Sequence, residues 1–320
     1  MLGWLGKKKD AGWTAIDVGS DGVHGVSVLA PRTPGDKPRV VKCGAMPGQR
    51  LDADTLIRLA RKISVPGCPW TLPLSRKEYN LLVVQEPTVQ PDEFEQSMRW
   101  SISTLIDYPV DEANIAWMKI PTVTLLPNRP PQMYVVVVKS EIVAWYSALF
   151  QQAKVPLQAI SVRETAQRNI AVLGGGPGEG TGLLSIGKHG VYFTATFNGE
   201  LYLDRFVEES LFVAPLTDAA HAPIEEERAC ERIVLQVQRS LDFISRNLQF
   251  IDINRLLMAP MPAYPDMGDF ISQHIQVPVE ALDLASIFDF SQTPELALRE
   301  NQAPYFFALG AALQFMENKA

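Results

Sequence analysis

The chain has 320 residues, 47% hydrophobic and 20% charged, which is enough for two domains or one large α/β unit with a sizeable core. It carries 29 basic and 36 acidic residues, a net charge of −7, and no long basic tract, which argues against a nucleic-acid surface. The three cysteines, Cys43, Cys68 and Cys230, are far apart and indicate a reducing compartment rather than a disulfide framework or a zinc site.

The sequence shows no apolar run near the ~20 residues that a membrane-spanning helix needs. At the start of the chain, Trp4 and Leu5 precede three lysines, Lys7 to Lys9, which is the reverse of the order in a signal peptide. Two interpretations of residues 1–12 remain open. They form a flexible, solvated tail, or a peripheral contact with an anionic inner leaflet.

The apolar patterns of the first half predict an alternation of strands and helices. Proline at position 91 followed by two acids predicts a helix start, because the helix dipole favours negative charge in the first turn. The apolar stripe of that helix is Phe94, Met98, Ile102 and Leu105. We expect strands at 13–18, 23–30, 38–44, 78–84, 113–120, 132–139 and 156–162, and further helices at 53–63, 140–153 and 164–173.

Residues 174–182 separate the two halves and contain six glycines in nine positions. They lack Gly-Lys-Ser/Thr and the G-x-G-x-x-G spacing, so we interpret them as a connector rather than a phosphate loop. Beyond them, Asn198-Gly199 is typical of a hairpin turn. We expect strands at 183–187, 191–197, 200–207 and 255–258, a long helix at 224–249, and helices at 267–275 and 304–317.

Both halves begin with a strand, a glycine-containing turn and a second strand, which suggests a duplicated architecture. The first turn lies in Ile16-Asp17-Val18-Gly19-Ser20-Asp21-Gly22-Val23. Three further segments stand out: Arg99-Trp100 followed by residues 106–112, the Arg239-Ser240-Leu241-x-Phe243 core of the long helix, and Gly310 in the last helix. In this order the segments resemble the PilM proteins of type IV pilus assembly, and most closely their relatives of the MshI type from biogenesis of the mannose-sensitive haemagglutinin (MSHA) pilus.

The resemblance implies an α/β, actin-like fold, in which two ribonuclease-H-like halves flank a cleft and the first half carries an inserted small subdomain. The expected divisions are a first half at 13–173 with the insert at about 85–158, the connector at 174–182, a second half at 183–303, and a C-terminal helix at 304–320 that returns to the first half. The resemblance also implies a cytoplasmic protein under the inner membrane. There it would bind the N-terminal cytoplasmic tail of a bitopic, PilN-like partner, alongside other proteins of the assembly platform.

In actin-like ATPases the two glycine turns grip the phosphates of ATP, and an aspartate holds Mg²⁺ through its waters. The first turn here matches that pattern with Asp17, Gly19, Ser20 and Gly22, and Asp17 is the candidate metal residue. The alternative is an edge hairpin in which Gly22 permits a positive φ.

The second turn departs from the pattern, because Ser185 replaces the expected aspartate and cannot supply its charge. Gly187 is retained, and Lys188 either offers a cation to a phosphate or is a solvated turn residue. After the strand at 255–258, Pro260 and Pro262 stand where the family has glycines that make room for the base. We therefore expect a degenerate nucleotide site in which ATP and Mg²⁺ are not required.

Aromatic residues gather in the expected insert, where a peptide-binding surface would use them as anchors. The candidates are Trp100, Tyr108, Trp117, Tyr134 and Trp145. The resemblance implies that a groove between the insert and the first half receives the partner's extended tail, and strand addition would explain how a short peptide binds there. The expected function is thus that of a scaffold and not of an enzyme. The alternative is an ATPase or sugar kinase of the same fold.

Overall fold

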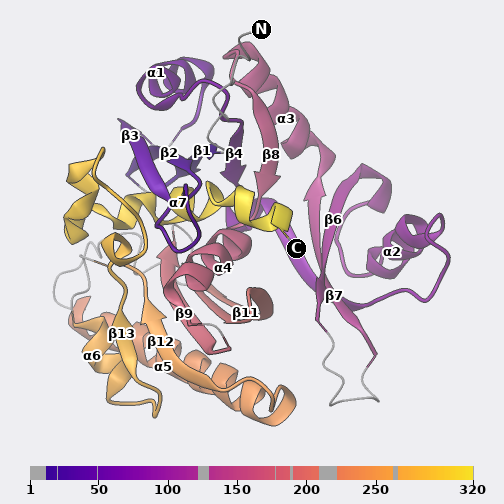
Figure 1. Ribbon diagram of the computed structural model, residues 1–320. Helices are drawn as coiled ribbons and strands as arrows, with labels where there is room; N and C mark the ends of the chain where they lie inside the picture. Colours follow the sequence, from indigo (N-terminus) through magenta and orange to yellow (C-terminus); the bar gives the residue numbers. More distant parts are fainter. Residues whose placement is uncertain are drawn as a thin grey trace, which may run out of the picture.

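The computed structural model describes residues 12–19, 21–48, 50–121, 130–176, 178–187, 190–208, 222–261 and 266–319 (Figure 1). Its first sheet has the strand order β3-β2-β1-β4-β8. β2 runs antiparallel to β1 and β3, whereas β4 is parallel to β1 and β8. The strands are β1 (Gly12–Val18), β2 (Gly22–Leu29), β3 (Arg39–Pro47), β4 (Trp70–Pro73) and β8 (Leu157–Ser161).

The second sheet repeats this arrangement with the order β11-β10-β9-β12-β13. Its directions repeat too, because β10 is antiparallel to β9 and β11, and β12 is parallel to β9 and β13. The strands are β9 (Gly180–Gly187), β10 (Gly190–Phe197), β11 (Glu200–Glu208), β12 (Ile253–Met258) and β13 (Val279–Ala281). Two sheets of the same order and direction make this the duplicated, actin-like α/β fold expected from the sequence.

Helices form three layers around the two sheets (Figure 1). α4 (Arg163–Gly174) and α7 (Phe306–Ala311) share one buried core with residues of both sheets, including Ala15, Val26, Leu183 and Leu257. α1 (Ala53–Ile63) and α3 (Ser140–Gln152) cover the outer face of the first sheet, and α5 (Ala222–Asn247) and α6 (Met267–Ser272) cover the second. Short 3₁₀ turns lie at 76–78, 110–112, 284–286, 294–297, 299–301, 303–305 and 314–319.

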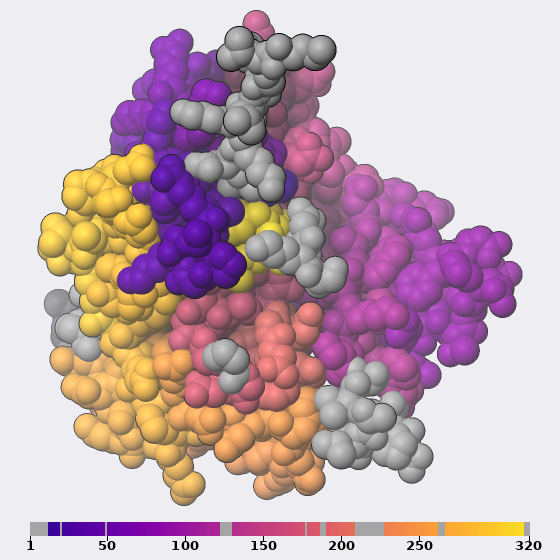
Figure 2. All heavy atoms as spheres, viewed as in Figure 1, coloured from indigo at the N-terminus to yellow at the C-terminus, as the bar shows by residue number. Residues whose placement is uncertain are grey.

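A third sheet, of order β5-β7-β6, stands beside the first half with α2 packed on one face (Figures 1 and 2). It comprises β5 (Tyr79–Gln85), α2 (Phe94–Ile102), β6 (Ala113–Ile120) and β7 (Gln132–Lys139), and we call residues 79–139 the insert. In Figure 2 the insert projects from the side of the molecule. α3, which falls within the expected insert at about 85–158, packs with the core of the first sheet.

Most predicted elements lie within a few residues of the observed ones, and three differences have physical reasons. β4 and β13 were not predicted, because each is short and β4 is buried along its whole length, so neither shows an alternating pattern. β9 begins at Gly180, inside the expected connector. The last helix is only Phe306–Ala311, since 3₁₀ turns replace helix on both sides.

Gly310 allows α4 and α7 to cross at close range between the two sheets. A Cβ atom on Gly310 would overlap the carbonyl oxygen of Ala166 and lie 2.7 Å from its carbonyl carbon. Asn169 supports the crossing, since its Nδ2 donates to the Gly310 carbonyl oxygen at 3.2 Å. The glycine is therefore a requirement of helix packing.

We predict that Gly310→Ala lowers the free energy of unfolding by about 2–3 kcal/mol, because the backbones must move apart. Gly268→Ala is the matched control, since the new Cβ would meet Met258 Sδ at an ordinary 3.7 Å. Urea unfolding of both variants checks this. Equal stability of the two variants would contradict the packing argument.

Candidate functional site

The first glycine turn joins β1 to β2, and a buried carboxylate, Asp17, lies near the end of β1. Asp17 is 4% exposed, and the amide of Gly19 donates to the carbonyl of Gly22 at 2.8 Å. Gly22 has no positive φ, and β2 is an inner strand, so the alternative of an edge hairpin is wrong. Glycine is needed there because a Cβ would overlap the carbonyl oxygen of Met46. Ser20 lies outside the described residues.

The Asp17 carboxylate is held by a cation that belongs to the protein itself. Nη2 of Arg163, the first residue of α4, lies 2.6 Å from Oδ1 of Asp17 and 3.3 Å from the carbonyl oxygen of Val18. The guanidinium carbon lies 4.4 Å from the ring centre of Phe307 on α7. Burial by itself lowers the pKa of Arg163, but Asp17 raises it and the net change is upward. This is therefore an ion pair at neutral pH.

The second glycine turn has its key side chain turned into the protein. Ser185 is 1% exposed, and its Oγ donates to Oε1 of Gln167 on α4 at 2.5 Å. Nε2 of Gln167 in turn donates to the Leu183 carbonyl oxygen at 2.6 Å and contacts Thr194 Oγ1 at 3.0 Å. Gly187 pairs with Gly190 in the hairpin, and Lys188 lies outside the described residues.

The described residues do not fit a hydrated Mg²⁺ beside these turns. Asp17 is the carboxylate at the expected metal position, and the buried Arg163 guanidinium already neutralises it. Asp21, in the same turn, lies 3.5 Å from His24 Nε2 and is largely exposed. Mg²⁺ binds through oxygen ligands such as carboxylates, so at Asp17 it would compete with Arg163. No three His, Cys, Asp or Glu side chains converge within the described part of the chain. In the segment where the sequence resemblance led us to expect glycines, Met258 and Ala259 are buried, and Ala259 donates its amide to the Leu184 carbonyl at 2.8 Å.

The five aromatic candidates do not form one surface. Trp100 is 80% exposed on α2, and Trp145 is half exposed on α3. Tyr134 is buried, and the main chain of Asp204 on β11 hydrogen-bonds its hydroxyl. Tyr108 is half-buried, with the Lys139 ammonium 5.2 Å from its ring centre. The remaining candidate, Trp117, contacts Phe94 and lines a groove.

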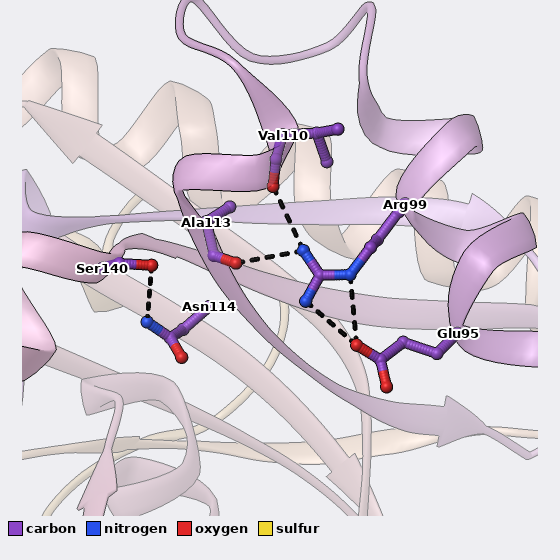
Figure 3. Close-up of polar contacts among 6 residues, drawn as sticks. All are labelled: Glu95, Arg99, Val110, Ala113, Asn114 and Ser140. Carbon is purple, nitrogen blue, oxygen red and sulfur yellow. Dashed lines mark hydrogen bonds and ion pairs between the residues drawn. The ribbon is translucent and has the colours of Figure 1, made fainter.

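The segment around Arg99 has a structural role in the insert (Figure 3). Nη1 of Arg99 donates to the carbonyl oxygens of Val110 and Ala113, both at 3.1 Å, and its Nη2 pairs with Glu95 at 2.9 Å. These contacts fasten α2 to the start of β6. Figure 3 also shows Asn114 reaching Ser140, at 2.9 Å, which links β6 to the start of α3.

A groove of about 460 Å³ lies between the insert and the first half. Ala116, Trp117 and Met118 of β6 form one wall, and 160–162 at the end of β8 form another. β6 and β8 are the end strands of their sheets, so each has a side without a strand partner among the described residues. Such edges are templates for an added strand. The remaining lining residues are Val136, Thr165, Arg168, Gly199, Glu200, Gln314 and Met316.

A second buried polar cluster joins the insert to both halves. The Tyr79 hydroxyl donates to Glu164 Oε2 at 2.5 Å, and Arg76 Nε lies 3.4 Å from Glu164 Oε1. The Arg76 guanidinium also lies 5.2 Å from the ring centre of Phe206 on β11. Asp204 is half-buried nearby, with its Oδ1 atom out of contact with solvent. Burial, followed by repulsion from Glu164, raises its pKa well above the usual range.

Comparison with known proteins supports the fold assignment. No family model matches the sequence, and no curated protein matches it. Among solved structures, the chain aligns with one from the PilM–PilN type IV pilus biogenesis complex at 16% identity and a TM-score of 0.73, over 96% of this chain and 99% of that chain. It also aligns with the cytoplasmic domain of EpsL, an inner-membrane component of the type II secretion system of Vibrio cholerae. That alignment has 10% identity and a TM-score of 0.51, and it covers 79% of this chain and 84% of that chain.

At these identities the likeness establishes the fold, which is that of PilM within the actin-like class. Within the described residues, no helix combines the length and the apolarity needed to cross a bilayer.

Sequence reasoning missed the residues of α4 that engage the two turns. Arg163 and Gln167 lie four positions apart, so they share one face of the helix. The sequence offers a weak signal, which is that polar residues occupy this face of a helix following a strand. Nothing in the spacing shows that the helix lies between two sheets, where both side chains become buried.

We predict that Asp204→Asn raises the free energy of unfolding at pH 7, because it removes a carboxylate whose charged form is disfavoured in the folded state. The raised pKa means that the folded state keeps a proton that the unfolded state releases above about pH 4, so stability falls as the pH rises. The gain should disappear as the pH falls toward 4. Urea unfolding across this range measures it, with exposed Asp242→Asn as the control. A gain in stability that does not depend on pH would contradict the raised pKa of Asp204.

Proposed function

We propose that the protein is a cytoplasmic scaffold of a type IV pilus assembly platform, of the MSHA type. In this role it binds the N-terminal cytoplasmic tail of a bitopic, PilN-like inner-membrane protein. The MSHA-type assignment rests on the sequence motifs, in particular Arg99-Trp100 with 106–112 and the Arg239–Phe243 core. The proposal for the partner rests on the groove and on the fold.

The observation that carries the proposal is the groove between two strand edges. An extended peptide placed there would extend the insert sheet at β6 or the first sheet at β8 through main-chain hydrogen bonds. Side chains of the peptide, which alternate in direction, would meet apolar surface from Trp117, Met118 and Met316. Arg168 and Glu200 add one charge of each sign to the lining.

The fold supports the same proposal. The alignment with a chain of a PilM–PilN complex extends over nearly the full length of both chains, insert included. An anchored partner would hold the scaffold at the cytoplasmic face of the inner membrane, where it would meet other platform proteins. Residues 1–9, with Trp4 beside three lysines, would add a peripheral contact with anionic lipid.

Turnover of ATP is no part of the proposed function. A sugar kinase or ATPase of this fold needs a carboxylate base near the transferred phosphoryl group and an intact second turn. Ser185 is instead a buried hydrogen-bond donor to Gln167. Bound ATP and Mg²⁺, where present, would have a structural or regulatory role.

The test is a pair of thermal-stability titrations, one with Mg-ATP and one with a peptide from the cytoplasmic tail of the PilN-like protein of the same organism. We expect the peptide to raise the unfolding midpoint and Mg-ATP to leave it unchanged. A peptide with N-methyl groups on alternate residues should bind far more weakly if it pairs as a strand. Micromolar nucleotide affinity with turnover would refute the scaffold role.

We predict that Ala116→Trp weakens peptide binding at least about tenfold, because the indole fills the groove. Ala148→Trp is the matched control, since Ala148 is exposed on α3 and lies outside the groove lining. Isothermal titration calorimetry measures both affinities. Unchanged affinity of the Ala116→Trp protein would place the peptide elsewhere.

A further inference from the structure

One face of α4 engages both glycine turns from inside the protein. Arg163 pairs with Asp17 at the end of β1, in the first sheet. Gln167, four residues later on the same helix, accepts a hydrogen bond from Ser185 in β9 of the second sheet. The two positions at which an actin-like ATPase would use metal-linked acids are thus tied to a single helix.

We propose that Arg163 takes the place of a metal ion at Asp17, and that α4 replaces Mg-nucleotide as the link between the two halves. The proposal goes beyond the scaffold function and does not depend on partner binding. It assigns Arg163 and Gln167 as positioning residues that hold both turns. The protein then keeps one relation between its halves without a bridging ligand.

The position of Arg163 makes exchange for a metal unfavourable. The side chain is buried at 2% exposure, with Asp17 on one side and the Phe307 ring on the other. The neighbouring carboxylate, Glu164, is engaged by Tyr79 and Arg76. A divalent cation at Asp17 would therefore leave a buried guanidinium without its carboxylate, which is the costly way to break a buried ion pair.

The contacts of Gln167 fix the second sheet to the same helix. Its Nε2 meets the Leu183 carbonyl oxygen of β9 and the Thr194 hydroxyl of β10, while Oε1 accepts from Ser185. Serine fits here because a neutral hydroxyl can donate to the amide oxygen. An aspartate at 185 would place its negative charge against that oxygen in a buried site.

The test compares Arg163→Met with the double variant Asp17→Asn/Arg163→Met. Methionine keeps much of the apolar stem of arginine beside Phe307 but leaves the Asp17 carboxylate buried without its cation. We expect a loss of several degrees in the unfolding midpoint of Arg163→Met, reversed in part by Mn²⁺, which can bind the uncompensated carboxylate. The double variant should regain part of the loss without metal and should not respond to Mn²⁺.

Three results would overturn the proposal: equal midpoints of the two variants with and without Mn²⁺, a metal response that survives in the double variant, or a wild-type midpoint that rises with Mn²⁺. Should Arg163→Met fail to fold while the double variant folds, the uncompensated charge is the cause and the proposal stands. If neither variant folds, Mn²⁺ is added to the wild-type protein, and the paramagnetic broadening of its amide NMR signals tests the proposal. We expect none at the amides of Val18 and Gly19, and broadening there would place the metal at Asp17.

Discussion

The structure depends on how α4 is held between the two sheets. Its first turn binds the end of β1 through the buried ion pair of Arg163 and Asp17, and its second turn binds β9 and β10 through Gln167. Its middle lies against α7 at Gly310, where side chains would keep the helices apart. Because the two sheets share one core through these helices, a change at this crossing affects both halves at once.

The same arrangement supports the proposed scaffold function. Arg163 and Gln167 of α4 bind Asp17 and Ser185 at the two glycine turns from within the chain. In the proposed scaffold function, the outer surfaces would bind the partner. The insert adds an open strand edge opposite the edge of β8, and the groove between them is the feature that a nucleotide site does not explain.

Local pattern was sufficient to predict the fold wherever one face of an element meets the core. The bounds of β6 and β7 agree with the predicted 113–120 and 132–139. The predicted long helix at 224–249 is confirmed as α5, with Cys230, Val234, Val237, Ile244 and Leu248 buried. Asn198 and Gly199 form the predicted hairpin turn, with φ of +49° and +86°. β4 was missed because Pro69 precedes it, Pro73 is its last residue, and it is buried throughout. Leu105 is exposed because α2 ends at Ile102.

The candidate site was less predictable, because its decisive contacts join residues far apart in sequence. Asp17 was identified from its motif, but its partner lies 146 residues away and opens a helix whose burial the sequence does not reveal. Ser185 was recognised as a departure from the pattern, while its hydrogen bond to Gln167 became visible only in the fold. The aromatic residues were grouped by composition, and the fold distributes them over different surfaces, with Trp117 at the groove.

The central claim is that this chain binds an extended protein segment at the edges of β6 and β8 without help from nucleotide. Hydrogen–deuterium exchange of the protein with the tail peptide, with and without Mg-ATP, tests it most directly. We predict protection confined to residues 113–120 and 157–162 and the same in both conditions. Protection by Mg-ATP at 14–24 and 183–194, with no effect of the peptide on the two edges, would contradict the account.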